Sequence, residues 1–441
     1  MERAPDTPSR EPHVVIVGGG FAGLNAAREL GRAAVDVPMR VTLVDQHNHH
    51  TFQPLLYQVA TAGLEPQSIG RSLRGALRRL PVDVRLGVVV AVDWDDRRVV
   101  LDDGARLPFD TLVLAAGAET ADYGIPGVAE HAFPLKWIPD GIALRNHLLR
   151  QFEQVEVRPA AVDDGALTFV VAGGGPTGVE LSGAIAELVD QVIRHDHPRV
   201  DVSRVRIVLV EMLDTLLAPY SRRSQDYSRA ALERRGVEVR TGTAIEAVDD
   251  DGVVLAGGER IRAATVIWTA GVRANPLADR LGVTQGHGGR VPVAADLRLP
   301  GHGDAFVVGD LAAAVGRDGK PLPQLAPVAI QQGHHVAEQI IRLRRGKSTK
   351  PFHYRDRGTM ATIGRKDAVA ELPFGVRLRG PSAWLAWLGL HLLYLVGFRN
   401  RVTVVVNWTY NYVTYDRAAR LILDTATTEP QRVDAASPGP H

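Results

Sequence analysis

The chain has 441 residues, 45% hydrophobic and 23% charged, which allows two or three globular domains with substantial cores. A net charge of +1 gives no reason to expect a nucleic-acid partner. The polar residues 1–13 have no apolar stretch of the secretory kind, so we expect no export, and residues 1–12 should form a loose tail. Cysteine is absent, which excludes disulfides, thiolate metal sites, iron–sulfur clusters and redox-active thiols.

The first structural signal is a dinucleotide-binding pattern. Residues 14–17 are consecutive apolar residues, typical of a strand buried on both faces. Three glycines spaced G-x-G-x-x-G follow, and then a helical apolar pattern: Gly18, Gly20 and Gly23. They suit a tight turn, close approach of a pyrophosphate and close helix packing. A second strand, 41–44, ends at Asp45, where a carboxylate can accept hydrogen bonds from a ribose hydroxyl.

A histidine-rich segment follows this pattern. His47, His49 and His50 lie almost contiguously and lack the helical spacing of metal ligands, so we expect no metal there. We expect residues 47–60 to form a loop that closes over a bound aromatic ring.

The same pattern occurs a second time. Residues 168–172 lead into Gly173, Gly175 and Gly178, with Pro176 near the first helical turn. Residues 207–210 then end at Glu211. One module used twice predicts two bound nucleotides, and hence electron transfer between them.

Each of the two modules is followed by a further buried strand that ends in glycine. Strand 110–116 ends at Gly117 and strand 264–270 at Gly271. Gly18 and Gly117 are 99 positions apart, and Gly173 and Gly271 are 98 apart. This agreement supports an internal duplication.

The carboxylates that end the second strands, Asp45 and Glu211, predict the type of nucleotide. A carboxylate there favours a free ribose hydroxyl and repels a 2′-phosphate, so the pyridine nucleotide should be NADH rather than NADPH. The alternative is an acid that only forms the turn. The residues themselves do not say which module takes which nucleotide.

A further strand and helix complete the nucleotide-binding part. Residues 305–308 predict a buried strand before Asp310, whose carboxylate would suit a sugar-alcohol chain as an acceptor. Residues 325–342 have a helical apolar pattern with Gln331 and Gln332 near its start.

The C-terminal part carries an interfacial signal. Residues 384–398 are fifteen residues without formal charge, and eight of the chain's 25 aromatic residues fall within 384–415. Tryptophan and tyrosine flanked by arginine suit a segment lying on a membrane. The alternative is a buried helix at a dimer or interdomain interface. Residues 424–441 are polar and should form a disordered tail.

These motifs together resemble those of the type II NADH dehydrogenases, which are single-chain flavoprotein NADH:quinone oxidoreductases. The resemblance covers roughly residues 12–423. It rests on both glycine motifs, the aromatic C-terminal region and four further segments: 48–63 with its core 52–57, 176–181, 268–272 and 308–310.

The resemblance implies an α/β fold with two Rossmann-like dinucleotide-binding domains and a C-terminal membrane-binding region. The implied limits are 12–125 with 290–345 for a discontinuous FAD-binding domain, 126–289 for the NADH-binding domain and 346–423 for the membrane-associating region. The implied FAD residues are Gly18, Gly20, Gly23, Asp45 and Asp310, and the implied NADH residues are Gly173, Gly175, Gly178 and Glu211. Five further residues are expected to bind a cofactor, without assignment to either nucleotide: Gln53, Pro54, Gly117, Ala326 and Gly271.

The family's helix-start motif Ala-Gln-x-Ala-x-Gln departs here. Ala326 and Gln331 match it, while Pro327 replaces the first glutamine. The resemblance implies catalytic roles for Gln331 and for Glu180, which would face the flavin and relay protons. A glutamate near a helix start is otherwise explained by the helix dipole.

The implied activity is oxidation of NADH through FAD, with two electrons passed to a membrane quinone and no proton pumping. The implied location is the cytoplasmic side of the cell membrane, as a peripheral protein attached through 384–415, and a homodimer stays open. Two alternatives remain: a soluble NADH-dependent ferredoxin reductase, and a non-catalytic regulatory protein that binds FAD and NADH. The former gives no use for the aromatic segment.

Overall fold

The computed structural model describes residues 11–414 and 419–423, without the side chains of 411–414. The expected tail 424–441, most of the expected tail 1–12, and residue 415 of the expected membrane segment lie outside the described residues.

The first domain is built on a six-stranded sheet with the order β21-β22-β9-β1-β2-β5. Neighbouring strands are parallel except β21 and β22. The strand bounds are β1 His13–Val17, β2 Arg40–Asp45, β5 Val82–Leu86, β9 Thr111–Leu114, β21 Arg298–Leu299 and β22 His302–Val307. Val17 pairs with Val44 and with Leu114, so the glycine loop and the end of β2 meet at one edge of the sheet.

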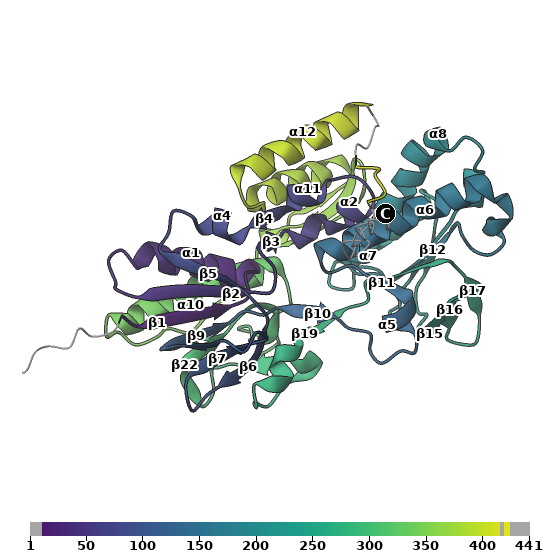
Figure 1. The fold of residues 1–441 in the computed structure, drawn as a ribbon. Coiled ribbons are helices and arrows are strands. Elements are labelled where there is room, and N and C mark those ends of the chain that lie inside the picture. The colour runs from purple at the N-terminus through teal and green to yellow at the C-terminus, as the bar shows by residue number, and fades with distance from the viewer. Residues whose placement is uncertain (1–10, 415–418, 424–441) are drawn as a thin grey trace, which may run out of the picture.

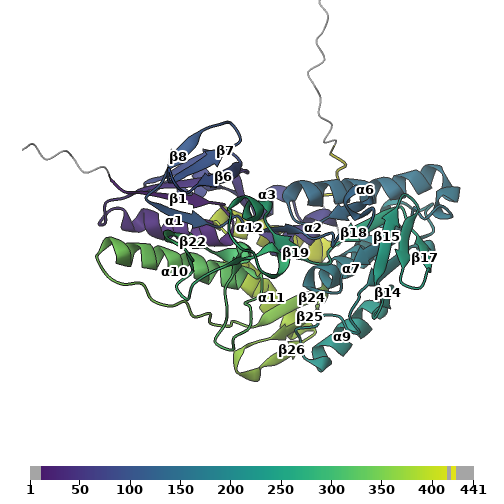
Figure 2. The ribbon, with the colours of Figure 1, turned by 90° about the horizontal axis from the view of Figure 1, so that it is seen from below.

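Two long helices cover one face of this sheet side by side, α1 (Phe21–Ala33) and α10 (Ala326–Arg344) (Figures 1 and 2). Their crossing is close because Gly333 has no side chain. A methyl group there would lie 2.2 Å from the Ala22 carbonyl oxygen.

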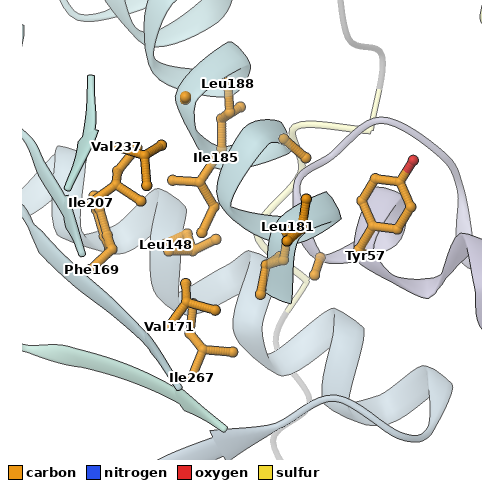
Figure 3. Close-up of a cluster of buried hydrophobic side chains, with 14 of the residues drawn as sticks. Tyr57, Leu148, Phe169, Val171, Leu181, Ile185, Leu188, Ile207, Val237 and Ile267 are labelled. Atoms are coloured by element: carbon orange, nitrogen blue, oxygen red, sulfur yellow. The ribbon is translucent and has the colours of Figure 1, made fainter. Parts of the chain in front are cut away.

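The second domain repeats the architecture with five parallel strands in the order β11-β18-β12-β13-β14. The strands are β11 Ala132–Pro134, β12 Thr168–Ala172, β13 Arg206–Val210, β14 Val237–Arg240 and β18 Thr265–Trp268. Its longer helices are α6 Ile138–Val157, α7 Pro176–Leu188 and α9 Arg222–Glu233. Figure 3 shows Ile185 of α7 near Ile207 and Val237 of this sheet, all within one buried cluster. The predicted second module is confirmed.

Each domain also carries a three-stranded antiparallel meander that the sequence pattern did not predict. The first contains β6 Val89–Asp93, β7 Arg98–Leu101 and β8 Arg106–Pro108; the second contains β15 Ile245–Asp249, β16 Gly252–Leu255 and β17 Arg260–Arg262. Between the domains, β10 (Ala118–Thr120) pairs with β19 (Val272–Ala274) (Figure 1). The duplication therefore extends beyond the glycine motifs.

The packing bears on where the chain returns to the first domain. Leu277, Ala278 and Leu281 are buried in one cluster with Val15 and Val17 of β1. This favours a return just after β19 rather than at residue 290. The other domain limits stay predictions.

The C-terminal part consists of a small antiparallel sheet and two helices. They are β24 Thr359–Gly364, β25 Asp367–Glu371, β26 Arg377–Arg379, α11 Pro381–Tyr394 and α12 Phe398–Thr414. β24 packs on α7, where a methyl group on Gly183 would lie 1.9 Å from the Ile363 carbonyl oxygen.

The uncharged stretch 384–398 is not one continuous helix. The chain leaves helical conformation after Tyr394 and turns at Gly397, whose φ is +99°. The helices on either side contact each other, and the rings of Trp387 and Trp408 lie 5.9 Å apart between centroids. Neither these two helices nor any other in the described part of the chain is long and apolar enough to cross a membrane.

The remaining elements are short. They are β3 His49–Thr51, β4 Gly70–Ser72, β20 Val291–Pro292, β23 Ala312–Ala313, α2 Leu56–Ala60, α3 Pro66–Ile69, α4 Leu73–Leu77, α5 Val128–His131 and α8 Arg194–Asp196.

Candidate functional site

A cavity of about 660 Å³ opens where the first sheet, the start of α7 and α11 meet. It lies at the carboxyl ends of the parallel strands, where α/β sheets bind ligands. Ten of the predicted site residues line it: Gly18, Gly20, Asp45, Gln53, Pro54, Gly117, Glu180, Gly271, Asp310 and Ala326. Six others do not: Gly23, Gly173, Gly175, Gly178, Glu211 and Gln331.

The first glycine loop has three distinct steric environments. Gly18 has φ +102°, and a methyl group on it would lie 2.3 Å from the Ala115 carbonyl oxygen. A methyl group on Gly23 would lie 1.8 Å from the Gly18 carbonyl oxygen. Gly20 has an ordinary φ of −69°, and a methyl group on it would meet no protein atom within 4 Å. The protein alone does not require glycine at position 20, whereas a ligand passing close to the backbone does.

The second loop repeats these environments. Gly173 has φ +104°, and a methyl group on Gly178 would lie 1.8 Å from the Gly173 carbonyl oxygen. Gly175 has φ −71° and open space at its Cβ position. Both loops therefore have a packing glycine and a glycine that faces open space.

The two acids at the strand ends are held by equivalent hydrogen bonds. Asp45 accepts the Gly19 N–H (2.5 Å) and the His47 N–H (2.6 Å). Glu211 accepts the Gly174 N–H (2.6 Å) and the Leu213 N–H (2.7 Å). Each carboxylate is thus fixed beside its glycine loop, with lone pairs left for a ribose hydroxyl.

Asp310 lies in the middle of the cavity wall beside a cation that the sequence motifs did not reveal. Its Oδ2 is 3.9 Å from Nζ of Lys136. Burial raises the pKa of Asp310, against the opposing charges of Lys136 and Arg290. Burial lowers the pKa of Lys136, against Asp310 and Glu119. Lys136 lies in sequence between the predicted strands 110–116 and 168–172, far from Asp310. Only the folded chain brings the two residues together.

Glu180 contributes a buried carboxyl group to the wall of the cavity. It lies on α7, is 8% exposed, and its Oε1 accepts the Thr362 N–H (3.3 Å). Burial raises the pKa of Glu180 to about 8, against smaller opposing effects of that N–H and of the Trp387 indole. The carboxyl group is therefore largely protonated at neutral pH.

A second cavity of about 60 Å³ lies on the other side of Glu180. Its lining includes polar groups on and just after α7 and α2: Glu187, Gln191, Gln58 and Thr61. A polar space of this size can hold water. Glu180 borders both cavities.

The structure separates the two glutamines at the start of α10. The side-chain amide of Gln331 donates to the Arg355 carbonyl (2.9 Å) and accepts the Arg355 N–H (3.0 Å), so it braces a neighbouring segment. Gln332 is buried, and its Oε1 accepts the Gly309 N–H (2.6 Å) beside Asp310. The start of α10 lines the cavity through other residues, among them Ala326, Pro327 and Ile330.

Helix α11 contributes His391 and Tyr394 to the wall of the cavity. The His391 ring stacks on Trp387 with centroids 4.1 Å apart, and its Nδ1 donates to the Trp387 carbonyl (2.8 Å). Burial lowers the pKa of His391 to about 4, so the ring is neutral. The sequence pattern did not reveal this role because His391 looked like one polar residue in an interfacial segment.

The histidine-rich segment contributes to the wall as well, but the loop expected over 47–60 is wrong. Residues His49–Thr51 pair with β4 as strand β3, and the chain continues through a short 3₁₀ helix, Gln53–Leu55, into α2. His50 Nδ1 donates to the Gly19 carbonyl (3.1 Å), and its ring meets Phe21 edge-on. Within the described residues, no group of three or more His, Cys, Asp or Glu side chains could hold a metal ion.

Comparisons with known proteins decide the family. Residues 12–333 match the family described as pyridine nucleotide-disulphide oxidoreductase, and residues 357–414 match the NDH2 C-terminal domain. The type II NADH:quinone oxidoreductase Ndh of Mycobacterium tuberculosis is 38% identical over 434 residues, covering 95% of this chain and 91% of that protein. The chain belongs to the type II NADH:quinone oxidoreductase family.

Other type II NADH:quinone oxidoreductases agree with this assignment. The Staphylococcus aureus member is 31% identical, covering 84% of this chain and 92% of its own length. NDH2 from Plasmodium falciparum, solved in complex with NADH, superimposes with a TM-score of 0.84 at 18% identity, covering 94% of this chain and all of that one. The sulfide:quinone oxidoreductase of Aquifex aeolicus gives 0.69 at 17% identity, over 91% of this chain and 95% of that one. At such identities these two structures establish the shared fold.

Family membership also narrows the redox chemistry. The wider family is described by disulphide chemistry, but a chain of 441 residues without cysteine cannot form a redox-active disulfide. Members of the type II NADH:quinone oxidoreductase family use FAD and NADH, and the residues fit both. The fit rests on the open Cβ positions at Gly20 and Gly175, on the two fixed carboxylates, and on one cavity that spans both domains.

Proposed function

We propose that this chain oxidises NADH with the help of FAD held in the large cavity, and that it reduces a membrane quinone. One observation carries the proposal. Pro176 and Thr177, the first two residues of α7 directly after the second glycine loop, line the same cavity as Gly18, Gly20 and Asp45 of the first domain. A nucleotide held by the second domain therefore reaches a cofactor held by the first.

The residues of the chain have separable roles in this reaction. The loop at Gly18 and Gly20 and the Asp45 carboxylate bind FAD, with Asp310 placed for its sugar-alcohol chain. The loop at Gly173 and Gly175 and the Glu211 carboxylate bind NADH. When bound, FAD supplies acceptance of a hydride and delivery of two electrons.

Glu180 is placed to supply a proton to the quinone. A carboxyl group with a pKa of about 8 is mostly protonated at neutral pH, so it can donate, and it borders a second polar cavity from which it can be reprotonated. Quinone would enter at the end of the cavity formed by Ala326, Ile330 and His391. Gln331 is less suited to this reaction than its motif implied, because Arg355 takes its amide group.

The nicotinamide nucleotide is NADH rather than NADPH in this proposal. Glu211 is fixed by two backbone N–H groups, so it cannot swing away from a 2′-phosphate. We expect catalytic efficiency with NADPH to be at least about tenfold lower. Equal steady-state efficiencies for the two nucleotides would contradict the role of Glu211.

The membrane side of the proposal rests on α12. Its exposed residues recur at helical spacing and are mostly apolar: Phe398, Val402, Val405, Val406 and Tyr410. Residues on the other face are buried, among them Asn400, Val404 and Trp408. Such an exposed apolar stripe marks a binding surface, and we propose that it lies on the cytoplasmic surface of the membrane.

The proposal is tested by steady-state NADH oxidation by the FAD-loaded protein with two acceptors, a short-chain quinone and an iron–sulfur protein. We expect turnover with the quinone and little with the iron–sulfur protein. The reverse preference would favour the ferredoxin reductase alternative. Slow turnover with both would favour the regulatory protein.

A further inference from the structure

Two arginines that lie close together in the first domain are without an acidic partner. Arg28 lies on α1 and Arg71 on β4, and among the described residues neither side chain makes a hydrogen bond or ion pair. The Nε atom of Arg71 is buried and has no hydrogen-bond acceptor. The nearby acid Glu29 is already paired with Arg32 (2.7 Å) and His334 (3.3 Å).

The electrostatics of this pair are unfavourable as it stands. The pKa of Arg28 lies below its usual value because burial removes water from its guanidinium, and because Arg32 and Arg71 add positive charge. Partly buried guanidinium groups without an anion are costly, and two side by side are more so. An anion with several acceptor oxygens would satisfy both.

The pair is separate from the nucleotide cavity. Neither Arg28 nor Arg71 lines that cavity, so the pyrophosphate of FAD does not account for them. The neighbouring His50 does line the cavity, but its Nδ1 already donates to Gly19.

Arg71 lies instead at the turn between α11 and α12, with Arg28 near enough to interact with its charge. A methyl group built on Gly397 would lie 3.3 Å from Arg71 Nε, so the guanidinium packs against the main chain there. The Arg401 N–H donates to the Gly397 carbonyl (3.2 Å), which closes the first turn of α12 and leaves the amides before it outside the helical ladder. Free amides at the start of a long helix add to the attraction for an anion.

The surroundings of this turn indicate where the anion comes from. Phe398, the next residue after Gly397, is 83% exposed and begins the apolar stripe of α12. Phe398 would contact the acyl chains of a phospholipid, and the cationic notch beside it, formed by Arg28, Arg71 and the first turn of α12, would bind the phosphate. A phosphate attached to a lipid would enter the notch while Phe398 inserts.

We propose that Arg28, Arg71 and the first turn of α12 form a binding site for the phosphate of an anionic phospholipid. The inference rests on the proposed membrane face and adds the lipid class that this face selects. It places one headgroup at the start of α12, which fixes that helix relative to the bilayer.

The test uses purified FAD-loaded full-length protein and vesicles of phosphatidylcholine with or without phosphatidylglycerol, measured by co-sedimentation. Wild type should bind the anionic vesicles more tightly. Because each basic residue near an anionic surface contributes about fivefold, the double substitution Arg28→Gln with Arg71→Gln should weaken this binding about thirtyfold. Arg280→Gln, which removes an exposed arginine from another part of the first domain, should change it little.

Two further measurements distinguish a specific phosphate site from diffuse charge attraction and from a site for free phosphate. Arg71→Lys keeps the charge but loses the guanidinium fork, so it should bind nearly as poorly as Arg71→Gln. Wild-type binding by Arg71→Lys would mean diffuse attraction and overturn the site. Inorganic phosphate at constant ionic strength should not raise the melting temperature of wild type. If it raised that of wild type but not of the double variant, the ligand would be free phosphate rather than lipid.

A separate readout keeps this proposal distinct from the proposed function. NADH oxidation with a short-chain quinone should be unchanged in the double variant, which also shows that the protein is folded. Unchanged activity with unchanged vesicle binding would overturn the lipid site alone. Absence of quinone turnover in wild type would overturn the proposed function, while the vesicle assay would still report on the arginines.

Discussion

Glu180, for which we propose a catalytic role, also affects the folding stability of the protein. Its pKa is raised from 4.5 to about 8, so the folded protein keeps a proton that the unfolded chain releases above pH 4.5. Glu180 therefore lowers folding stability progressively as pH rises from about 4.5 to about 8, and this destabilisation reaches its full size above pH 8.

Glu180→Gln keeps the shape of the side chain and removes the titrating proton. We expect quinone reduction to fall about 10²-fold with unchanged FAD content. The wild-type rate should also decline as pH rises through about 8, and the variant should lose that decline. Melting temperature across pH gives a second measurement, since the variant should gain stability relative to wild type toward pH 8. Glu130→Gln, at an exposed position, is the control. Wild-type turnover in Glu180→Gln would leave the carboxyl group with the helix-dipole role only.

The glycines of each loop make a matched comparison. Gly20→Ala adds a methyl group in open space at an ordinary φ, so the protein should fold normally and lose FAD. Gly23→Ala places a methyl group 1.8 Å from a carbonyl oxygen, so it should destabilise the fold itself. Gly175→Ala should keep FAD and raise the KM for NADH about tenfold, or about 1.4 kcal/mol. Flavin absorbance and thermal melting separate these outcomes. Full FAD content in Gly20→Ala would contradict the close approach of FAD to the backbone at Gly20.

At the scale of single elements, the sequence predicted what is encoded locally. The buried strands at 14–17, 168–172 and 207–210, and the helix near 325–342, lie where their apolar patterns placed them. A parallel strand buried on both faces leaves a continuous apolar run, which needs no knowledge of its neighbours. The meanders were missed because each of their strands has five residues or fewer, too short for a clear apolar pattern.

The site was predictable as far as motifs reach. Both glycine loops and both terminal carboxylates follow from spacing alone. Lys136 and His391 do not, because each becomes a cavity residue only when segments far apart in sequence meet. The helix break before α12 was missed for a similar reason. It is stabilised by Asn400, whose side-chain N–H groups donate to the carbonyls of Ser68 (3.1 Å) and Gly70 (2.9 Å).

The apolar stripe of α12 gives a prediction at this scale. Val406 is 58% exposed, so Val406→Asp should not disturb packing, yet it places a charge where we propose the bilayer surface. Membrane association should fall about tenfold or more. Val315→Asp is a matched control, because Val315 is 56% exposed on a loop outside α12. Partition of both variants between membrane and soluble fractions measures the difference. Equal partition would contradict membrane contact by this stripe.

At the scale of the whole molecule, the C-terminal part ties together both nucleotide-binding domains. Asn400 holds α12 to the first domain through α3 and β4. The segment after α12 reaches the second domain, where the Leu423 N–H donates to the Asn146 side chain (3.1 Å) and Arg420 pairs with Asp196. This end of the chain lies beside α6 in Figure 1. The C-terminal part, which contributes His391 and Tyr394 to the cavity, is therefore connected to both nucleotide-binding domains.

This arrangement predicts a membrane topology. A helix of 14 residues such as α11 is about 21 Å long, short of the roughly 30 Å of hydrocarbon in a bilayer. Lying flat, α11 and α12 can place their exposed apolar residues in the interface and leave the arginines before and after α11 at the headgroups of one leaflet.

Because the chain has no cysteine, a single introduced cysteine is the only thiol available for labelling. Arg379→Cys lies just before α11 and Arg399→Cys at the start of α12. In inside-out membrane vesicles, a membrane-impermeant maleimide should label both, and in right-side-out vesicles neither. Arg280→Cys, in the nucleotide-binding part, reports which side the soluble domains occupy. If Arg379→Cys and Arg399→Cys were labelled from opposite sides, α11 would have to span the bilayer, and a flat arrangement on the cytoplasmic surface would be wrong.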